Sequence, residues 1–334
     1  MRAAYLGPPG TNSHDALVGT GLDVEQVALP TVPAVIRAVQ DGEVERGLVP
    51  LENSREGAVG STLDALVFDA PDVAIVGELI HRVSYCLAAA ERIAPDEVRT
   101  VHSHPQATAQ CARFLYDRAP GAAIVGASST ADAVRAVAEG DTLAGAPPHA
   151  AIGTRHAAEL YGAVVLAEAI EDDAENATRF AWIARRAAGG GAAGAAAPGE
   201  GAAGAAAPGE GAAGAAAPGE LHGPVVIRPA AGDDDGPSPA ARTLEPTKTA
   251  LVFWGAGDRA PGWLVACLSE FASRAINLTR IESRPRRIGL GHYMFFCDFV
   301  GDPGDPAVAE AVAGLRTHCE AVRILGSFPS AVAF

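Results

Sequence analysis

The feature that most limits how this chain can fold is a run of three identical decamers, Gly-Ala-Ala-Gly-Ala-Ala-Ala-Pro-Gly-Glu, from Gly191 to Glu220. Glycine and proline recur too often in it for a helix to persist. No decamer carries a large apolar side chain that could stack in a solenoid. The flanking residues are also rich in Gly, Pro and Asp. The sequence therefore predicts a disordered linker over 188–246, between two folded parts at 1–187 and 247–334.

The first part alternates short apolar runs with amphipathic stretches, which is typical of an α/β fold. Apolar runs at 3–6, 47–49 and 98–102 predict strands. Apolar residues at helical spacing predict a helix from Val32 to Val39, and Ser129 or Thr130 is a suitable cap for another. Since α/β sheets bind ligands where their strands end, the polar loops after these strands are candidate binding segments.

The second part has the β-α-β-β-α-β order of a ferredoxin-like fold. The expected strands and helices, in chain order, are a strand at 248–254, a helix at 261–274, strands at 277–282 and 292–299, a helix at 307–315 and a strand at 322–328.

Composition excludes several classes of function. The net charge is −15, with 25 basic and 40 acidic residues, which argues against nucleic acid or an anionic membrane as a partner. Lys248 is the only lysine, which disfavours Schiff-base chemistry. The 5 cysteines form no C-x-x-C pair, as expected of a reduced cytoplasmic protein without structural zinc. We expect no signal peptide after Met1-Arg2 and no membrane span.

Three successive side chains before the linker favour a functional site. Thr178, Arg179 and Phe180 offer a hydrogen-bond donor, a planar fork for a carboxylate and an apolar wall. Taken alone, the same residues also fit a surface strand, in which Thr178 is a β-former and Arg179 a solvated charge.

Four further motifs stand in a fixed order around this one. They are Gly7-Pro8-Pro9-Gly10-Thr11, Pro50-Leu51-Glu52-Asn53-Ser54, Ser103-His104-Pro105-Gln106 and Glu282-Ser283-Arg284-Pro285. With Thr178-Arg179-Phe180, they make the chain resemble the prephenate dehydratases, which form phenylpyruvate on the route to phenylalanine. The resemblance covers nearly the whole chain except the tract between the halves. It implies a two-lobed catalytic domain like type II periplasmic binding proteins, with the site in the cleft, and a ferredoxin-like ACT domain.

The resemblance also implies a chemistry. Prephenate carries two carboxylates and a ring hydroxyl, and loss of carbon dioxide and water makes its ring aromatic. Thr178 would hydrogen-bond the departing hydroxyl, and Arg179 would pair with the carboxylate that stays. Phe180 would limit hydration of the carboxylate that leaves. Neither a cofactor nor a metal is implied, since no carboxylate cluster accompanies His102 and His104.

Several polar residues are candidates for binding the substrate. The turn before Thr11 and Ser13 predicts a nest of backbone N–H groups for an anion. Ser103 is expected to cap the following helix, whose dipole would attract a carboxylate. A turn or a cap also explains these residues without a ligand. The full set is Thr11, Ser13, Asn53, Ser54, Ser103 and His104.

In the second part, the resemblance implies a site for L-phenylalanine as an allosteric ligand, and a homodimer or homotetramer paired through ACT domains. Trp263 stands where the family has a small residue, so its indole could reshape that site. The expected site residues are Gly262, Trp263, Leu264, Asn277, Leu278, Glu282, Ser283 and Arg284.

Three alternatives stay open. An arogenate dehydratase would act on the amino analogue of prephenate, and the sequence does not separate the two. A prephenate decarboxylase expels no hydroxyl, so the retained Thr178 weighs against it. A non-catalytic amino-acid-sensing module would not need Thr178-Arg179.

Overall fold

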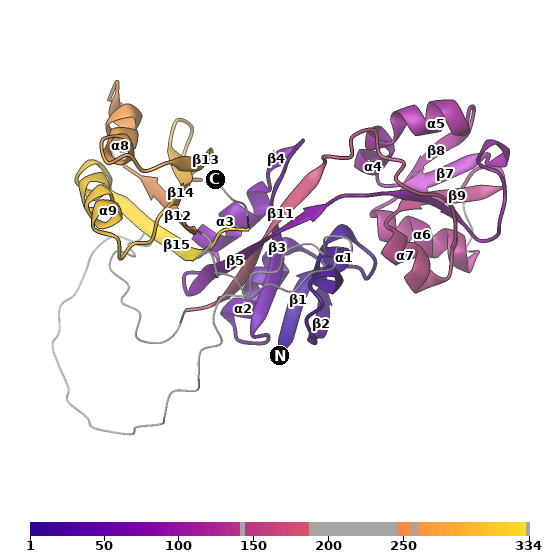
Figure 1. Cartoon of the computed structure of the whole chain (residues 1–334), viewed down its shortest axis with the longest axis horizontal. Helices are drawn as coiled ribbons and strands as arrows, with labels where there is room; N and C mark the ends of the chain where they lie inside the picture. Colours follow the sequence, from indigo (N-terminus) through magenta and orange to yellow (C-terminus); the bar gives the residue numbers. More distant parts are fainter. Residues whose placement is uncertain (141–143, 187–245, 256–259, 332–334) are drawn as a thin grey trace, which may run out of the picture.

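The computed structural model describes residues 1–140, 144–186, 246–255 and 260–331, which form three sheets in a row (Figure 1). Apart from Pro246, the predicted linker at 188–246 lies outside the described residues. Within those residues, no helix is long and apolar enough to cross a membrane.

Lobe 1 is the middle unit of Figure 1, built on a sheet of order β2-β1-β3-β11-β5 with β4 paired to β3. The helix predicted from Val32 to Val39 is confirmed as α2, and its residues Val35, Ile36 and Val39 are fully buried. The elements are β1 (Arg2–Leu6), α1 (Asn12–Gly19), β2 (Glu25–Leu29), α2 (Val32–Gln40), β3 (Arg46–Asn53), β4 (Gly57–Ala58), α3 (Gly60–Phe68), β5 (Val73–Arg82) and β11 (Ala177–Arg185).

Lobe 2 holds a second sheet, of order β10-β6-β9-β7-β8. The chain enters it after β5 and leaves it before β11, so two segments join the lobes. The two-lobed α/β architecture expected from the sequence is confirmed. The elements are β6 (Cys86–Ala89), η1 (Pro95–Glu97), β7 (Thr100–Ser103), α4 (Pro105–Gln110), α5 (Ala112–Arg118), β8 (Ala123–Gly126), α6 (Thr130–Glu139), β9 (His149–Gly153), α7 (Arg155–Tyr161) and β10 (Val164–Ala167).

The C-terminal unit has the predicted β-α-β-β-α-β order, and its strands are arranged β13-β14-β12-β15. Phe253, Phe271 and Phe299 are fully buried in one core with residues of both helices. The elements are β12 (Thr247–Trp254), α8 (Trp263–Ala272), β13 (Leu278–Pro285), β14 (Tyr293–Val300), α9 (Pro306–His318) and β15 (Ala321–Pro329).

The C-terminal unit packs directly against lobe 1. Val252 and Phe296 of its sheet share one hydrophobic cluster with Ile75 of β5. Where β15 crosses β5, a Cβ atom on Gly326 would lie 1.9 Å from the carbonyl oxygen of Ile75. At the end of α3, Arg323 donates hydrogen bonds to backbone carbonyls of lobe 1. The two units therefore form one packed body.

Gly326 generates a test of this contact. In Gly326→Ala, the new methyl group would collide with backbone atoms, so β15 has to move off β5. We expect the free energy of unfolding of the full chain to fall by about 1–3 kcal/mol, as for other overpacked sites. Gly19→Ala is the control, since a Cβ there meets nothing within 4 Å. Equal thermal midpoints for the two variants would contradict the close crossing.

Candidate active site

A cavity of about 440 Å³ is lined by residues of both lobes. Six of the nine predicted catalytic and substrate-binding residues line it, namely Thr11, Ser13, Asn53, His104, Thr178 and Phe180. A larger hollow, of about 800 Å³, lies along α5 of lobe 2 and is lined by none of the motif residues. The cavity that gathers the motifs is therefore the candidate site.

Thr178 is held in this cavity by Asn53, its neighbour across the β3–β11 pair. Asn53 Nδ2 donates to Thr178 Oγ1 at 3.0 Å. The amide orientation of Asn53 is fixed, because its Oδ1 accepts from the backbone N–H groups of Arg55 and Glu56. With its oxygen accepting from Asn53, the Thr178 hydroxyl has its own proton to donate to a bound molecule.

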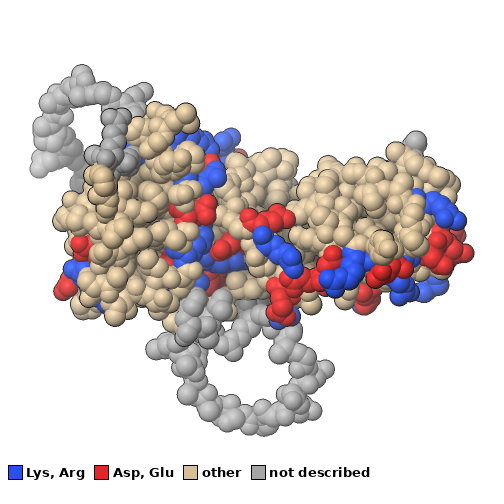
Figure 2. Space-filling view, turned by 90° about the horizontal axis from the view of Figure 1, so that it is seen from above, with Lys and Arg blue, Asp and Glu red and all other residues tan. Residues whose placement is uncertain are grey.

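Among the described residues that line the cavity, none is a lysine or an arginine. Instead, α1 and α6 begin there, with Thr11 and Ser129 as their caps, and the short α4 begins there at His104. The unpaired N–H groups of a first helical turn attract anions without any cationic side chain. On the face drawn in Figure 2, basic and acidic side chains lie side by side over the middle of the molecule.

Arg179 lies outside the cavity, which corrects its expected role as a carboxylate anchor. Successive side chains of a strand point to opposite faces, so Thr178 faces the cleft and Arg179 faces the C-terminal unit. There its Nε lies 2.7 Å from Glu78 Oε2 and its Nη1 lies 2.6 Å from Asp298 Oδ2. Only 10% of the Arg179 side chain is exposed.

Two serines that were predicted to bind the substrate, Ser54 and Ser103, do not line the cavity. Ser103 neither caps α4 nor lines the cavity, because it is fully buried and donates to the carbonyl of Ile152 at 2.7 Å. His104 is the cap instead, accepting from the backbone of Gln106 through Nδ1. Ser54 turns away from the cavity and accepts from the backbone N–H of Ala177 at 3.0 Å, where it fixes the start of β11.

Comparison with known proteins agrees with this geometry. The family model described as prephenate dehydratase matches residues 3–188. The chain belongs to the prephenate dehydratase family. A prephenate dehydratase of Mycolicibacterium vanbaalenii is 34% identical over 342 residues, covering 98% of this chain and 90% of the relative.

Two solved structures are similar over almost the whole chain. One is a prephenate dehydratase from Arthrobacter aurescens in complex with L-Phe, with a TM-score of 0.75, 30% identity and coverage of 99% of this chain and 90% of that one. The other is GqqA, described as a quorum-quenching acylase, with a TM-score of 0.73, 26% identity and coverage of 99% and 98%. Acyl transfer needs a nucleophile activated by a base. Within the described residues, no serine of the cavity hydrogen-bonds a histidine, and Ser128 and Ser129 both donate to Asp132.

The family motif Gly7-Pro8-Pro9-Gly10 joins the lobes and is not an open anion nest. Its backbone N–H groups are occupied, since Gly10 donates to His14 Nδ1 at 2.9 Å and Thr11 donates to the carbonyl of Pro8. Lobe 2 contacts the turn from the other side. There the hydroxyl of Thr154 donates to the carbonyl of Gly10 at 3.1 Å, and that of Tyr161 to the carbonyl of Pro9 at 2.7 Å.

In the C-terminal unit, Gly262, Trp263 and Leu264 line a cavity of about 220 Å³ together with Tyr293 and Phe295. The other residues predicted for phenylalanine binding do not line it in this chain. Asn277, Leu278, Glu282, Ser283 and Arg284 lie on β13 or next to it, at the edge of the sheet. Arg284 points to lobe 1, where it pairs with Asp64 through two hydrogen bonds of 3.1 and 2.8 Å.

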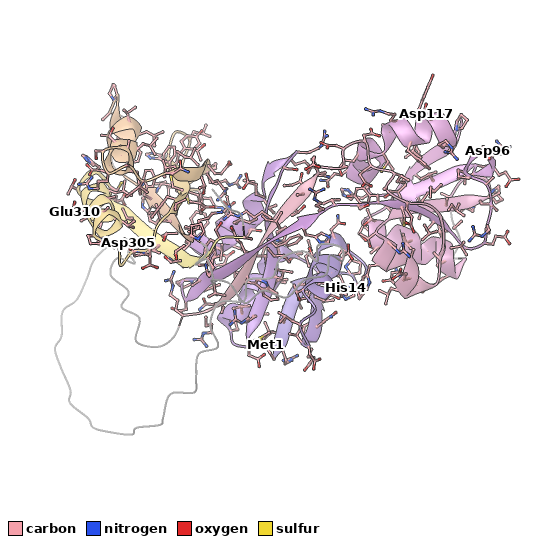
Figure 3. All side chains as sticks on the ribbon, in the orientation of Figure 1. Met1, His14, Asp96, Asp117, Asp305 and Glu310 are labelled. Carbon is pink, nitrogen blue, oxygen red and sulfur yellow. The ribbon has the colours of Figure 1, made fainter. Side chains whose placement is uncertain are left out.

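His14 is a titratable group at the contact between the lobes. It lies on the side of lobe 1 that faces lobe 2 (Figure 3), and its Nδ1 is 3.1 Å from Nε2 of His156 in α7. Its Nε2 lies 2.6 Å from Gln26 Oε1, so the neutral ring donates on one side and accepts on the other. Burial lowers the pKa of His14, and His156 lowers it further, against the opposing effects of Gln26 and Asp15.

The folded chain should therefore lose stability in mild acid. Above pH about 6.5, His14 is neutral in both the folded and the unfolded state, and its contribution is fully present. Below that pH the unfolded state takes up the proton first, so stability falls as pH falls. We expect the thermal midpoint to drop between pH 7.5 and 5.5, and to drop less in His14→Gln, which does not titrate. Equal pH slopes for the two proteins would show that His14 does not contribute.

Proposed function

We propose that this chain is a prephenate dehydratase, converting prephenate to phenylpyruvate, carbon dioxide and water in phenylalanine biosynthesis. The observation that carries the proposal is the Thr178 hydroxyl, which faces the cavity of a dehydratase-family fold and is held there by Asn53. The catalytic domain would comprise residues 1–187.

The reaction needs one pair of bonding electrons to move through the ring. The bond between the ring and its carboxylate breaks, and its electrons enter the ring as carbon dioxide leaves. The bond to the ring hydroxyl then breaks, and the departing oxygen needs a proton to become water. The hydroxyl of Thr178 donates a hydrogen bond to that oxygen. A threonine hydroxyl is too weak an acid to give up its proton fully, so Thr178 orients and partly protonates the leaving group.

The remaining parts of the cavity suit the two carboxylates. The first turns of α1 and α6 offer N–H donors for the carboxylate that stays. The carboxylate that leaves loses its charge as carbon dioxide forms, so an apolar wall that excludes water favours its departure. Phe180, Leu6 and Val83 supply apolar surface within the same cavity.

Thr178 provides the direct test. Wild-type protein should form phenylpyruvate from prephenate, measured by its ultraviolet absorbance. Arogenate keeps its amino group and would give phenylalanine instead, so the rate of phenylalanine formation from arogenate is measured to rank the two substrates. Thr178→Ala should lower kcat by about 10²–10³, the usual cost of one transition-state hydrogen bond, with little change in KM. Thr178→Ser keeps the hydroxyl and should retain most of the turnover.

Turnover of Thr178→Ala within twofold of wild type would remove Thr178 from the mechanism. Wild-type protein that binds prephenate or phenylalanine without turnover would favour the amino-acid-sensing module. Formation of a product that keeps the ring hydroxyl would identify a decarboxylase.

We further infer that residues 247–334 form an ACT domain through which L-phenylalanine regulates a cytoplasmic homodimer or homotetramer. Support comes from the β-α-β-β-α-β fold and from the 30% identical dehydratase structure in complex with L-Phe. The cavity beside Gly262 and Trp263 is the candidate ligand site. Because the Glu282-Ser283-Arg284 segment lies on the edge strand β13, a paired domain of a second copy could bring it to the ligand.

Tyr293 offers a test of this ligand site, since it lines the cavity and is 43% exposed, so its removal should not unfold the domain. In Tyr293→Ala we expect the phenylalanine concentration for half-maximal response to rise about tenfold, equivalent to ~1.4 kcal/mol of binding. Tyr116→Ala, on lobe 2 and 81% exposed, is the control. Identical responses in both variants would place the ligand elsewhere. Light scattering would show separately whether the full chain is a dimer or a tetramer.

A further inference from the structure

Six charged side chains meet where lobe 1 contacts the C-terminal unit, and we call them the junction cluster. Lobe 1 supplies two acids and one base, and the C-terminal unit supplies two bases and one acid. Each unit alone therefore leaves one charge of the cluster uncompensated. The members are Glu52, Glu78 and Arg179 from lobe 1, and Lys248, Arg280 and Asp298 from the C-terminal unit.

Glu78 shows how tightly the two units are joined. Its side chain has no exposed surface, and it accepts hydrogen bonds from Lys248 Nζ at 3.0 and 3.1 Å. The hydroxyl of Ser330 and the backbone N–H of Ala331 also donate to it, at 3.1 and 2.8 Å. Within the part of the chain that the structure describes, Arg179 is the one donor to the Glu78 carboxylate that comes from lobe 1. Removing such partners would leave a buried charge uncompensated and would lower the free energy of unfolding.

The junction cluster lies directly behind Asn53 and Thr178, which we call the catalytic pair. On β3, Glu52 of the cluster precedes Asn53 of the cavity, and on β11, Thr178 of the cavity precedes Arg179 of the cluster. The strand register pairs Thr178 with Asn53 and Arg179 with Glu52. Arg179, the residue after Thr178, forms an ion pair with Asp298 of the C-terminal unit. The hydrogen bond that orients the Thr178 hydroxyl is thus one residue away from that ion pair.

We propose that Asp298, with Lys248 and Arg280, acts as a positioning residue for catalysis. By fixing Arg179 and Glu78, the C-terminal unit holds β11 in the place where Asn53 and Thr178 meet at 3.0 Å. Reacting groups lose much of their effect when they move by about 1 Å. A displacement of the C-terminal unit would therefore change turnover through the backbone of β11, without any contact between that unit and the substrate. This proposal rests on the dehydratase function assigned to Thr178.

The experiment compares two variants that each remove one charge from the same contact between units. Asp298→Asn removes the partner of Arg179 behind the catalytic pair. Asp64→Asn removes the partner of Arg284 and Arg287, neither of which belongs to the junction cluster. Both are measured as full-length chains, well below their thermal midpoints. Asp298→Asn should lower kcat about 10- to 100-fold with KM changed less than about twofold, whereas Asp64→Asn should keep kcat within about twofold of wild type.

A double variant separates positioning from general loss of stability. If Asp298 acts through Thr178, then Asp298→Asn should cost little further turnover in a Thr178→Ala background. The proposal is overturned if Asp298→Asn lowers kcat no more than Asp64→Asn does, or if its effect persists in full without the Thr178 hydroxyl. Inactive wild-type protein would instead refute the dehydratase function, so the two failures are distinguishable.

Discussion

The carboxylate of Glu78 is fully buried at the contact between lobe 1 and the C-terminal unit, and the arrangement of β5, β11 and β12 depends on it. Burial alone would raise the pKa of Glu78, but the charges of Arg179 and Lys248 and the hydrogen bonds from Lys248 and Ala331 hold it below its ordinary value. The group is therefore ionised, and an ionised group in such a place has to keep its partners. Three of its partners, Lys248, Ser330 and Ala331, come from the C-terminal unit, and the fourth, Arg179, comes from the strand that carries Thr178. The contact between units and the shape of the active site are thus stabilised by one set of charges.

The same division of charge explains how an acidic chain can bind an acidic substrate. Arg179, which follows Thr178 on β11, and Arg280 are both engaged in the junction cluster and do not line the cavity. Anions in the cavity have to be met by neutral donors, which the starts of α1 and α6 provide. Helix N-termini keep their polarity at any pH.

Much of the fold follows from local patterns in the sequence. The helix of Val35, Ile36 and Val39 and the β-α-β-β-α-β order of the C-terminal unit are set by spacing and by turn residues, and both are confirmed. Thr178, Asn53 and His104 were predicted for the site and line its cavity. Arg179 was predicted to bind a carboxylate in the site, but it does not line the cavity. The alternation of side chains along a strand could have indicated this, because it places Thr178 and Arg179 on opposite faces. Glu78 and Asp298 were missed because their partners are about 100 or more residues away in the chain. Ser129 or Thr130 was predicted as a helix cap, and Ser129 is the cap, but only the packing of lobe 2 brings it to the cavity.

In the mechanism that we propose, the C-terminal unit sets the geometry of the catalytic pair through the junction cluster. The most direct measurement is a crystal structure of the Asp298→Asn variant beside that of the wild type, with the distance from Asn53 Nδ2 to Thr178 Oγ1 as the quantity compared. In the wild type that distance should be 3.0 Å, as in the present structure. We expect the distance to lengthen beyond about 3.5 Å in the variant, so that the hydrogen bond is lost. An unchanged hydrogen bond in a variant whose turnover has fallen would show that Asp298 does not position Thr178.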